Sequence, residues 1–234
     1  MLKKIVLVIV EGITDETALG VVLSHVYDKN VVYLQIMRGD ITTRYDVTPQ
    51  NIISKIGNVV KNYAKSGNYK SADFRQIIHI VDTDGAYISD DNIIEDQSLD
   101  TLLYEADGIY TYNRQSTILR NANKRANLHR ICVLSQIWNV PYSVYYMSCN
   151  LDHVLHDKRN STETEKMQDA YAFAEKYQRD TEGFIKFLGE SEFSVKGDFE
   201  KSWDYIKEGM HSIERHTNLC ICIDAEVQNV KCKQ

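Results

Sequence analysis

The chain has 234 residues, of which 43% are apolar and 26% charged, and its formal net charge is −6. This composition is typical of a globular protein with a sizeable core, and it excludes a generally basic protein that coats nucleic acid. No segment approaches the roughly 20 apolar residues that cross a bilayer, and five cysteines lack disulfide-framework spacing, so we expect a cytoplasmic protein.

The first part of the chain predicts alternating strands and helices. The predicted elements are a strand over residues 3–10, a helix over 14–27, a strand over 31–37, a helix from the Thr48-Pro49 pair to about residue 63, and a strand over 74–81. Thr14 is the predicted N-cap of the first helix, and Pro49 suits the first turn of the second. This order predicts a parallel sheet flanked by helices, with right-handed crossovers.

The second part begins with a polar loop that reaches about residue 98. It is followed by a predicted helix over 114–138, a strand over 141–147 and helices from residue 161 onward. We therefore expect an α/β domain over residues 1–157 and a helical C-terminal extension over residues 158–234 that packs on it.

Two acidic signatures follow the apolar strands. Glu11 ends the first strand and Asp15 lies four residues later, while Asp82 and Asp84 end the strand over 74–81. Open α/β sheets bind ligands beyond the carboxyl ends of their strands, and clustered carboxylates suit Mg²⁺ or Mn²⁺. Purely structural interpretations stay open: Asp15 also suits a helix N-terminus, and Asp-Thr-Asp-Gly also forms a good turn.

Together the two signatures resemble the TOPRIM superfamily, which has a Glu-Gly after its first strand and an Asp-x-Asp after a later one. Here these are Glu11-Gly12 and Asp82-Thr83-Asp84, and the resemblance covers roughly residues 1–155. The stretch from Val10 to Leu19 is most similar to OLD-type nucleases and stand-alone TOPRIM proteins of bacterial phage defence.

The resemblance implies a magnesium-dependent nuclease that hydrolyses phosphodiester bonds of DNA or RNA. In it, Asp82 and Asp84 hold metal, Glu11 serves as ligand or general acid/base, and Asp15 helps to hold a second ion. Asp152, just after the strand over 141–147, is the candidate for a further carboxylate. The competing candidates are Glu105 and Asp107, and Lys158 is the candidate for the lysine of OLD-type enzymes.

A basic stretch supplies a candidate nucleic-acid-binding surface. No acidic residue lies between Asp107 and Asp152, whereas five basic residues do: Arg114, Arg120, Lys124, Arg125 and Arg130. Basic side chains bind backbone phosphates, although a solvated helix face explains the same pattern about equally well.

Alternative functions remain at this point. One is a noncatalytic TOPRIM-like module that binds nucleic acid or regulates a partner. Since the chain lacks a Gly-x-x-x-x-Gly-Lys-Ser/Thr loop, any partner ATPase is a separate chain. Another is a phosphatase of the HAD type, with Asp82 as nucleophile and Asp84 as acid/base. A homo-oligomer is compatible with the sequence.

Two weaker patterns concern metal-binding side chains. His153 and His156 have the spacing of a helical pair, and a second set comprises His216, Cys220, Cys222 and Cys232. Burial explains the cysteines more simply.

Overall fold

The computed structural model describes residues 3–27, 32–38 and 41–231. Its elements in chain order are β1 (Lys4–Val10), α1 (Ile13–Val26), β2 (Val32–Arg38), α2 (Ile52–Ser66), a 3-10 turn (Ser71–Asp73), β3 (Phe74–Asp82), a 3-10 turn (Asp90–Asn92), β4 (Ile93–Glu95), β5 (Leu103–Glu105), β6 (Gly108–Thr111), α3 (Arg114–Cys132), β7 (Gln136–Ile137), β8 (Val140–Met147), α4 (Leu151–His156), α5 (Glu163–Tyr177), α6 (Thr181–Glu190), α7 (Phe199–Tyr205) and α8 (Leu219–Lys231).

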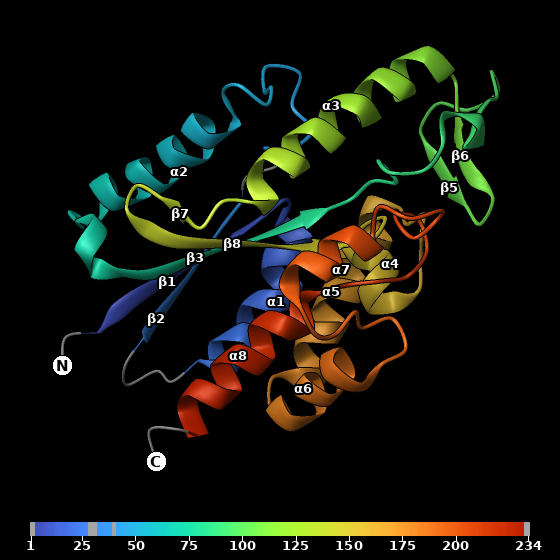
Figure 1. Cartoon of the computed structure of the whole chain (residues 1–234). Coiled ribbons are helices and arrows are strands. Elements are labelled where there is room, and N and C mark those ends of the chain that lie inside the picture. The colour runs from blue at the N-terminus through green and yellow to red at the C-terminus, as the bar shows by residue number, and fades with distance from the viewer. Residues whose placement is uncertain (1–2, 28–31, 39–40, 232–234) are drawn as a thin grey trace.

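In the described part of the chain, five strands form the main sheet, in the order β2-β1-β3-β8-β7 (Figure 1). β2, β1, β3 and β8 are parallel, and the short β7 is antiparallel to β8. Every residue of β1 from Ile5 to Val10 is buried, because helices cover both faces of the sheet. The chain is therefore an α/β protein with a mixed sheet flanked by helices.

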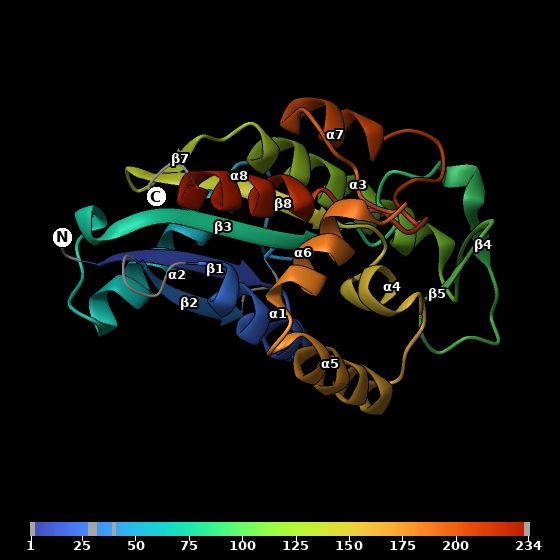
Figure 2. The ribbon, with the colours of Figure 1, turned by 90° about the horizontal axis from the view of Figure 1, so that it is seen from below.

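The two faces of β1 belong to different hydrophobic cores. Its even-numbered residues from Val6 to Val10 pack with α1, α5, α6 and α8, and its odd-numbered residues from Ile5 to Ile9 pack with α2, α3 and α7. Figure 1 shows α2 and α3 on one side of the strands and α1 and α8 on the other, and α5 lies beside α1 in Figure 2. The C-terminal helices therefore share a core with the first helix of the sheet. None of the described helices is both long and apolar enough to span a bilayer.

The start of α2 differs from its predicted position at Thr48-Pro49. The N–H groups of Asn51 and Ile52 donate to the Thr48 carbonyl at 3.0 and 2.9 Å, which closes a turn before the helix. α2 itself begins at Ile52. The predicted start of this helix at Thr48-Pro49 is therefore wrong, because both residues belong to the preceding turn.

The predicted helix over 114–138 is too long at its C-terminal end. α3 stops at Cys132, and residues 136–147 form the β7–β8 hairpin. Trp138 and Asn139 have φ values of 53° and 60°, the left-handed backbone of a tight hairpin turn. A turn that contains tryptophan lacks the usual Asn-Gly signature, so composition alone favoured a helix here.

The segment between β3 and α3 contains a small sheet that was not predicted from the sequence. Its strands have the order β4-β6-β5, and none is longer than four residues. Ile88, Ile93, Ile109 and Ile213 form its small core. Such short strands carry too little alternation to separate them from loop.

Candidate metal centre

The carboxyl ends of β1 and β3 lie side by side at the point where the strand connections diverge, β1 leading to β2 and β3 leading to β8 on its other side. Open α/β sheets bind ligands at such points. Glu11 directly follows β1, Asp15 lies in the first turn of α1, Asp82 ends β3, and Asp84 follows two residues later. The fold thus brings the four predicted carboxylates to one edge of the sheet.

A wholly buried lysine of α3 connects two of these carboxylates. The Lys124 ammonium forms an ion pair and hydrogen bond with Asp84, lies 3.7 Å from Glu11 Oε1, and donates to Thr43 Oγ1 at 3.0 Å. Burial alone lowers the pKa of a lysine, but the charges of Asp84, Glu11 and Asp82 outweigh it and raise the pKa of Lys124. Lys124 therefore remains charged and neutralises part of the centre.

Asp82 and Asp84 have opposite electrostatic environments. Burial raises the pKa of Asp82 well above its usual value, and the charges of Glu11, Asp15 and Asp84 raise it further. Burial acts in the same direction on Asp84, but the cationic groups of Lys124 and Arg120 lower its pKa overall. Within the described residues, Asp82 accepts no side-chain hydrogen bond. Asp82 is therefore the carboxylate that most requires an added cation.

A cavity of about 390 Å³ opens beside Asp82. Its lining comes from the β1–α1 turn, the end of β3, the β8–α4 turn and α5: Glu11, Gly12, Ile13, Thr14, Asp15, Asp82, Asn150, Leu151, Asp152, Glu163 and Lys166. Lys166 Nζ donates to Glu163 at 2.9 Å. Lys166 thus lines a predominantly acidic cavity, whereas Lys124 contacts Glu11 and Asp84 from outside its lining.

The structure places Asp15 and Asp152 in this cavity with different local roles. Asp15 Oδ2 accepts the Gly12 N–H at 2.8 Å, so it caps α1, and burial raises its pKa. The N-cap of α1 is therefore Gly12, and the prediction that Thr14 caps this helix is wrong. Burial raises the pKa of Asp152 to about 6, with Lys166 acting in the opposite direction.

Hydrogen bonds with residues in the C-terminal half of the chain hold the Asp82-Thr83-Asp84 turn in place. Thr83 Oγ1 donates to the Ser212 carbonyl at 2.7 Å and accepts the Cys149 N–H at 2.9 Å. Asp84 has φ 50°, a left-handed conformation that aspartate and asparagine tolerate better than most residues. The carboxylates of Asp82 and Asp84 therefore project from a turn with fixed geometry.

The basic residues of α3 do not form one exposed face. The Arg114 guanidinium donates to the carbonyls of Ile93 and Asp90 at 2.8 and 2.6 Å. Arg120 donates to the Asp84 carbonyl at 2.9 Å, and Lys124 is buried in the centre. Arg125 is partly exposed with Asp90 4.0 Å away, and Arg130 is exposed. Of the five predicted phosphate-binding residues, one is thus exposed, three are partly buried and one is fully buried.

The competing acidic and basic candidates lie elsewhere. Glu105 ends β5, and Asp107 lies in the turn between β5 and β6, where it accepts the Tyr110 hydroxyl at 3.0 Å. Lys158 is paired with Asp169 at 2.6 Å on the surface. None of these three candidates lines the cavity.

In the described residues, neither predicted set of histidines and cysteines forms a group of three close ligand atoms. His153 is buried in α4, and the His156 ring packs edge-on against Phe173 at 5.7 Å. Cys220 and Cys222 are buried in α8, as free cysteines commonly are, and Cys232 lies outside the described residues.

The donor set of the centre fits a hard divalent cation. Its candidate ligands are all oxygen atoms, and five carboxylates, those of Glu11, Asp15, Asp82, Asp84 and Asp152, share the site with two lysines. The carboxylates do not yet enclose an ion: in the described residues, the one His/Cys/Asp/Glu group with three ligand atoms within 4.8 Å of one another is His211, Glu214 and His216. A divalent ion at Asp82 therefore requires side-chain movement around it.

No family model matches this chain, and no curated protein or solved structure matches it significantly.

Some residues of the centre were not predicted from the sequence: Thr42, Thr43, Lys166, and Lys124 in its buried role. Thr42 Oγ1 donates to Glu11 Oε1 at 3.0 Å, and its carbonyl accepts the Asn127 amide at 3.0 Å. For Lys124, the only signal in the sequence was its position around the helix axis, since Asn121, Lys124 and Leu128 share the buried face of α3.

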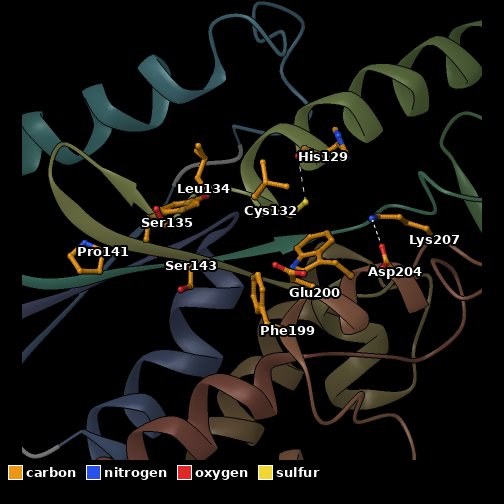
Figure 3. Close-up of a pocket in the computed structure, with 13 residues that line it drawn as sticks. His129, Cys132, Leu134, Ser135, Pro141, Ser143, Phe199, Glu200, Asp204 and Lys207 are labelled. Carbon is orange, nitrogen blue, oxygen red and sulfur yellow. Dashed lines mark hydrogen bonds and ion pairs between the residues drawn. The ribbon is translucent and has the colours of Figure 1, made fainter.

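A second cavity, of about 630 Å³, lies away from the carboxylates, between the C-terminal end of α3, β8 and α7 (Figure 3). Phe199 and Trp203 of α7 line it, and Lys207 pairs with Asp204 at its edge at 2.9 Å. Its lining contains two acidic residues, Glu200 and Asp204, fewer than the lining of the smaller cavity.

Proposed function

We propose that this protein is a magnesium-dependent nuclease of the TOPRIM type, acting on DNA or RNA. The observation that supports it most is Asp82, whose carboxylate accepts no side-chain hydrogen bond from the described residues. It lies among Glu11, Asp15 and Asp84, at the carboxyl ends of two adjacent parallel strands. Manganese fits the same oxygen ligands.

The chain's own groups suggest how the site divides its work. Asp82 and Asp84 are the metal ligands, while Asp15 and Asp152 line the side on which a second ion fits. Bound Mg²⁺ would supply a Lewis acid and an activated water for phosphodiester hydrolysis. Lys124 holds Glu11 and Asp84 in place before any ion binds, and Lys166 provides a positive charge at the cavity wall for a phosphate.

The test is cleavage of a panel of single- and double-stranded DNA and RNA with and without Mg²⁺. We expect Asp82→Asn and Glu11→Gln to lower metal-dependent cleavage at least about 100-fold, because a metal ligand and a candidate acid/base are lost. Glu105→Gln removes an exposed carboxylate outside the cavity and is the matched control. Cleavage that survives in both site variants would contradict the proposal.

Protonation gives this proposal a pH dependence. Because the pKa of Asp82 is raised, its carboxylate loses charge at a higher pH than an ordinary aspartate, and a protonated carboxylate is a poor metal ligand. We therefore expect Mg²⁺ affinity to increase with pH, and titration calorimetry of the wild type at several pH values measures it.

A noncatalytic module that binds nucleic acid or regulates a separate ATPase is the second candidate. Lys124 supports it, because its charge lets Glu11 and Asp84 pack without any metal. If purified protein binds the panel but cuts none of it, alone or with an ATPase, this function replaces the nuclease.

A phosphatase of the HAD type has less support. Its second aspartate has to deliver a proton, but Asp84 is paired with Lys124 and its pKa is lowered.

A further inference from the structure

The segment between α7 and α8 carries a second cluster of ligand-type side chains, separate from the carboxylate centre. His216 Nε2 lies 3.4 Å from Glu214 Oε2, and His211 Nε2 lies 3.9 Å from the same oxygen. One ligand atom from each residue lies within 4.8 Å of the other two. Ligands bound to tetrahedral zinc at 2.0–2.1 Å are roughly 3.4 Å apart, so a small contraction suffices to close the cluster around an ion.

The His211 ring is already held in the orientation of a metal ligand. Its Nδ1 lies 2.7 Å from the Tyr205 carbonyl, and since a carbonyl only accepts, Nδ1 carries a proton. In the neutral ring the Nε2 lone pair then faces Glu214, an arrangement that needs a proton or a metal ion between the two. The Tyr205 ring stacks on His211 with centroids 4.0 Å apart and restricts its rotation. A backbone acceptor on the remote nitrogen is typical of metal-bound histidine.

His216 has the access that a ligand requires. Its side chain is 16% exposed, against 47% for Glu214. Its Nε2 also contacts the Tyr205 hydroxyl at 3.3 Å, so that hydroxyl competes for the same lone pair. An ion can therefore reach the cluster from solvent through Glu214.

One buried serine positions the backbone of all three ligand residues. The Ser148 N–H donates to the His216 carbonyl at 2.8 Å, and the Ser148 hydroxyl lies 2.7 Å from the His211 carbonyl and also contacts the Glu214 carbonyl. Ser148 follows β8 and is fully buried. The three side chains therefore project from a backbone fixed to the rigid sheet, as a preorganised site requires.

We propose that His211, Glu214 and His216 form a transition-metal site, for which zinc is the preferred ion. Two imidazoles and one carboxylate suit Zn²⁺, whereas Mg²⁺ prefers oxygen ligands only. The site is thus chemically distinct from the centre at Asp82. The Ser212 carbonyl, in the same segment as the three ligands, accepts hydrogen bonds from Thr83 Oγ1 and the Cys149 N–H. A bound ion fixes this segment, so its role is to stabilise the Asp82-Thr83-Asp84 turn.

The experiment is titration of chelator-treated full-length protein with Zn²⁺ in excess Mg²⁺, followed by calorimetry and by the shift in melting temperature. Co²⁺ as a second probe reports nitrogen ligation through its visible spectrum. We expect one zinc per chain and a raised melting temperature in the wild type and in Asp82→Asn, because the carboxylate centre is not involved.

Substitution of the ligand residues tests the proposed zinc site directly. Loss of an outer-shell partner of a metal site costs about 10–100-fold in affinity, so His211→Ala and His216→Ala should each lose at least about 100-fold. Tyr205→Phe, which removes the competing hydroxyl but keeps the stacked ring, should bind zinc at least as tightly as the wild type. His129→Ala changes an exposed histidine of α3 and is the control.

Circular dichroism of each variant without metal separates lost ligation from lost folding. Zinc affinity that is unchanged in folded His211→Ala and His216→Ala protein would overturn the proposal, as would a wild type that binds no zinc at micromolar concentrations.

Discussion

Burying a lysine costs several kcal/mol unless its charge is matched, and removing one partner of a buried ion pair typically costs about 3–5 kcal/mol. Lys124 satisfies this condition with Asp84 and Glu11. The sequence placed Glu11, Asp82 and Asp84 correctly at one edge of the sheet, because an acidic residue that ends an apolar strand has little choice of position. The position of Lys124 was not predicted, since the sequence shows that a lysine is charged but not in which direction its side chain points.

Lys124→Met is expected to destabilise chelator-treated protein by about 3–5 kcal/mol, because Glu11 and Asp84 then lack their buried counter-charge. Added Mg²⁺ should restore part of this loss by replacing the charge. Urea unfolding with and without Mg²⁺ measures both effects. Arg130→Met, an exposed change on the same helix, is the control, and equal stability of the two variants without Mg²⁺ would refute the role assigned to Lys124.

Asp152 gives a pH-dependent prediction. Its pKa is raised to about 6 in the folded protein, so the folded state binds its proton more tightly than the unfolded state. Stability from this group is present below about pH 4 and is lost as pH rises through 6. Asp152→Asn should therefore stabilise the metal-free protein by about 1–3 kcal/mol at pH 8 and by little at pH 4. Thermal unfolding at both pH values tests it, and an equal effect at the two pH values would contradict it.

Among the elements, predictability followed length and periodicity. The buried strands β1, β3 and β8 were located within about one residue because each is a long apolar run. The small sheet and β7 were missed, since strands of two to four residues carry almost no periodic signal. On α3, the buried face is polar at Thr117, Asn121 and Lys124, so the usual apolar stripe that reveals a helix's inner side is absent.

The packing of α5 against its neighbours is the element-level test. Phe173 is 5% exposed and its ring contacts those of Tyr177, Phe184 and Phe187, with centroids 4.8, 6.2 and 5.7 Å away. Phe173→Ala is expected to cost about 3–5 kcal/mol. Tyr171→Ala, on the same helix but 62% exposed, should cost little.

Two probes of the Phe173→Ala unfolding curve then show whether α5 and α6 unfold independently of the rest of the chain. Trp138 and Trp203 report by fluorescence from outside α5 and α6, whereas circular dichroism reports all helices. Because α5 shares a core with α1, we expect the two curves to coincide. An earlier transition in circular dichroism alone would indicate that α5 and α6 unfold by themselves.

For the whole molecule, the alternation of strands and helices predicted the α/β architecture. It could not show which C-terminal residues contact the strands of the main sheet. Thr217 Oγ1 donates to the Tyr146 carbonyl at 2.7 Å, and Arg75 of β3 pairs with Glu226 of α8. Contacts between residues so far apart depend on the assembled fold and leave no local pattern in the sequence.

The support of Thr83 by Ser212 also has a consequence for protein synthesis. The two residues are 129 positions apart, and ribosomes add about 5–20 residues per second, so Thr83 waits roughly 10 s for its partner. Until then the Asp82–Asp84 turn lacks the carbonyl that fixes it, and the nascent chain cannot complete its carboxylate centre. In a cell that makes this protein, the site is therefore complete only after the segment around Ser212 has left the ribosome and folded back onto β8.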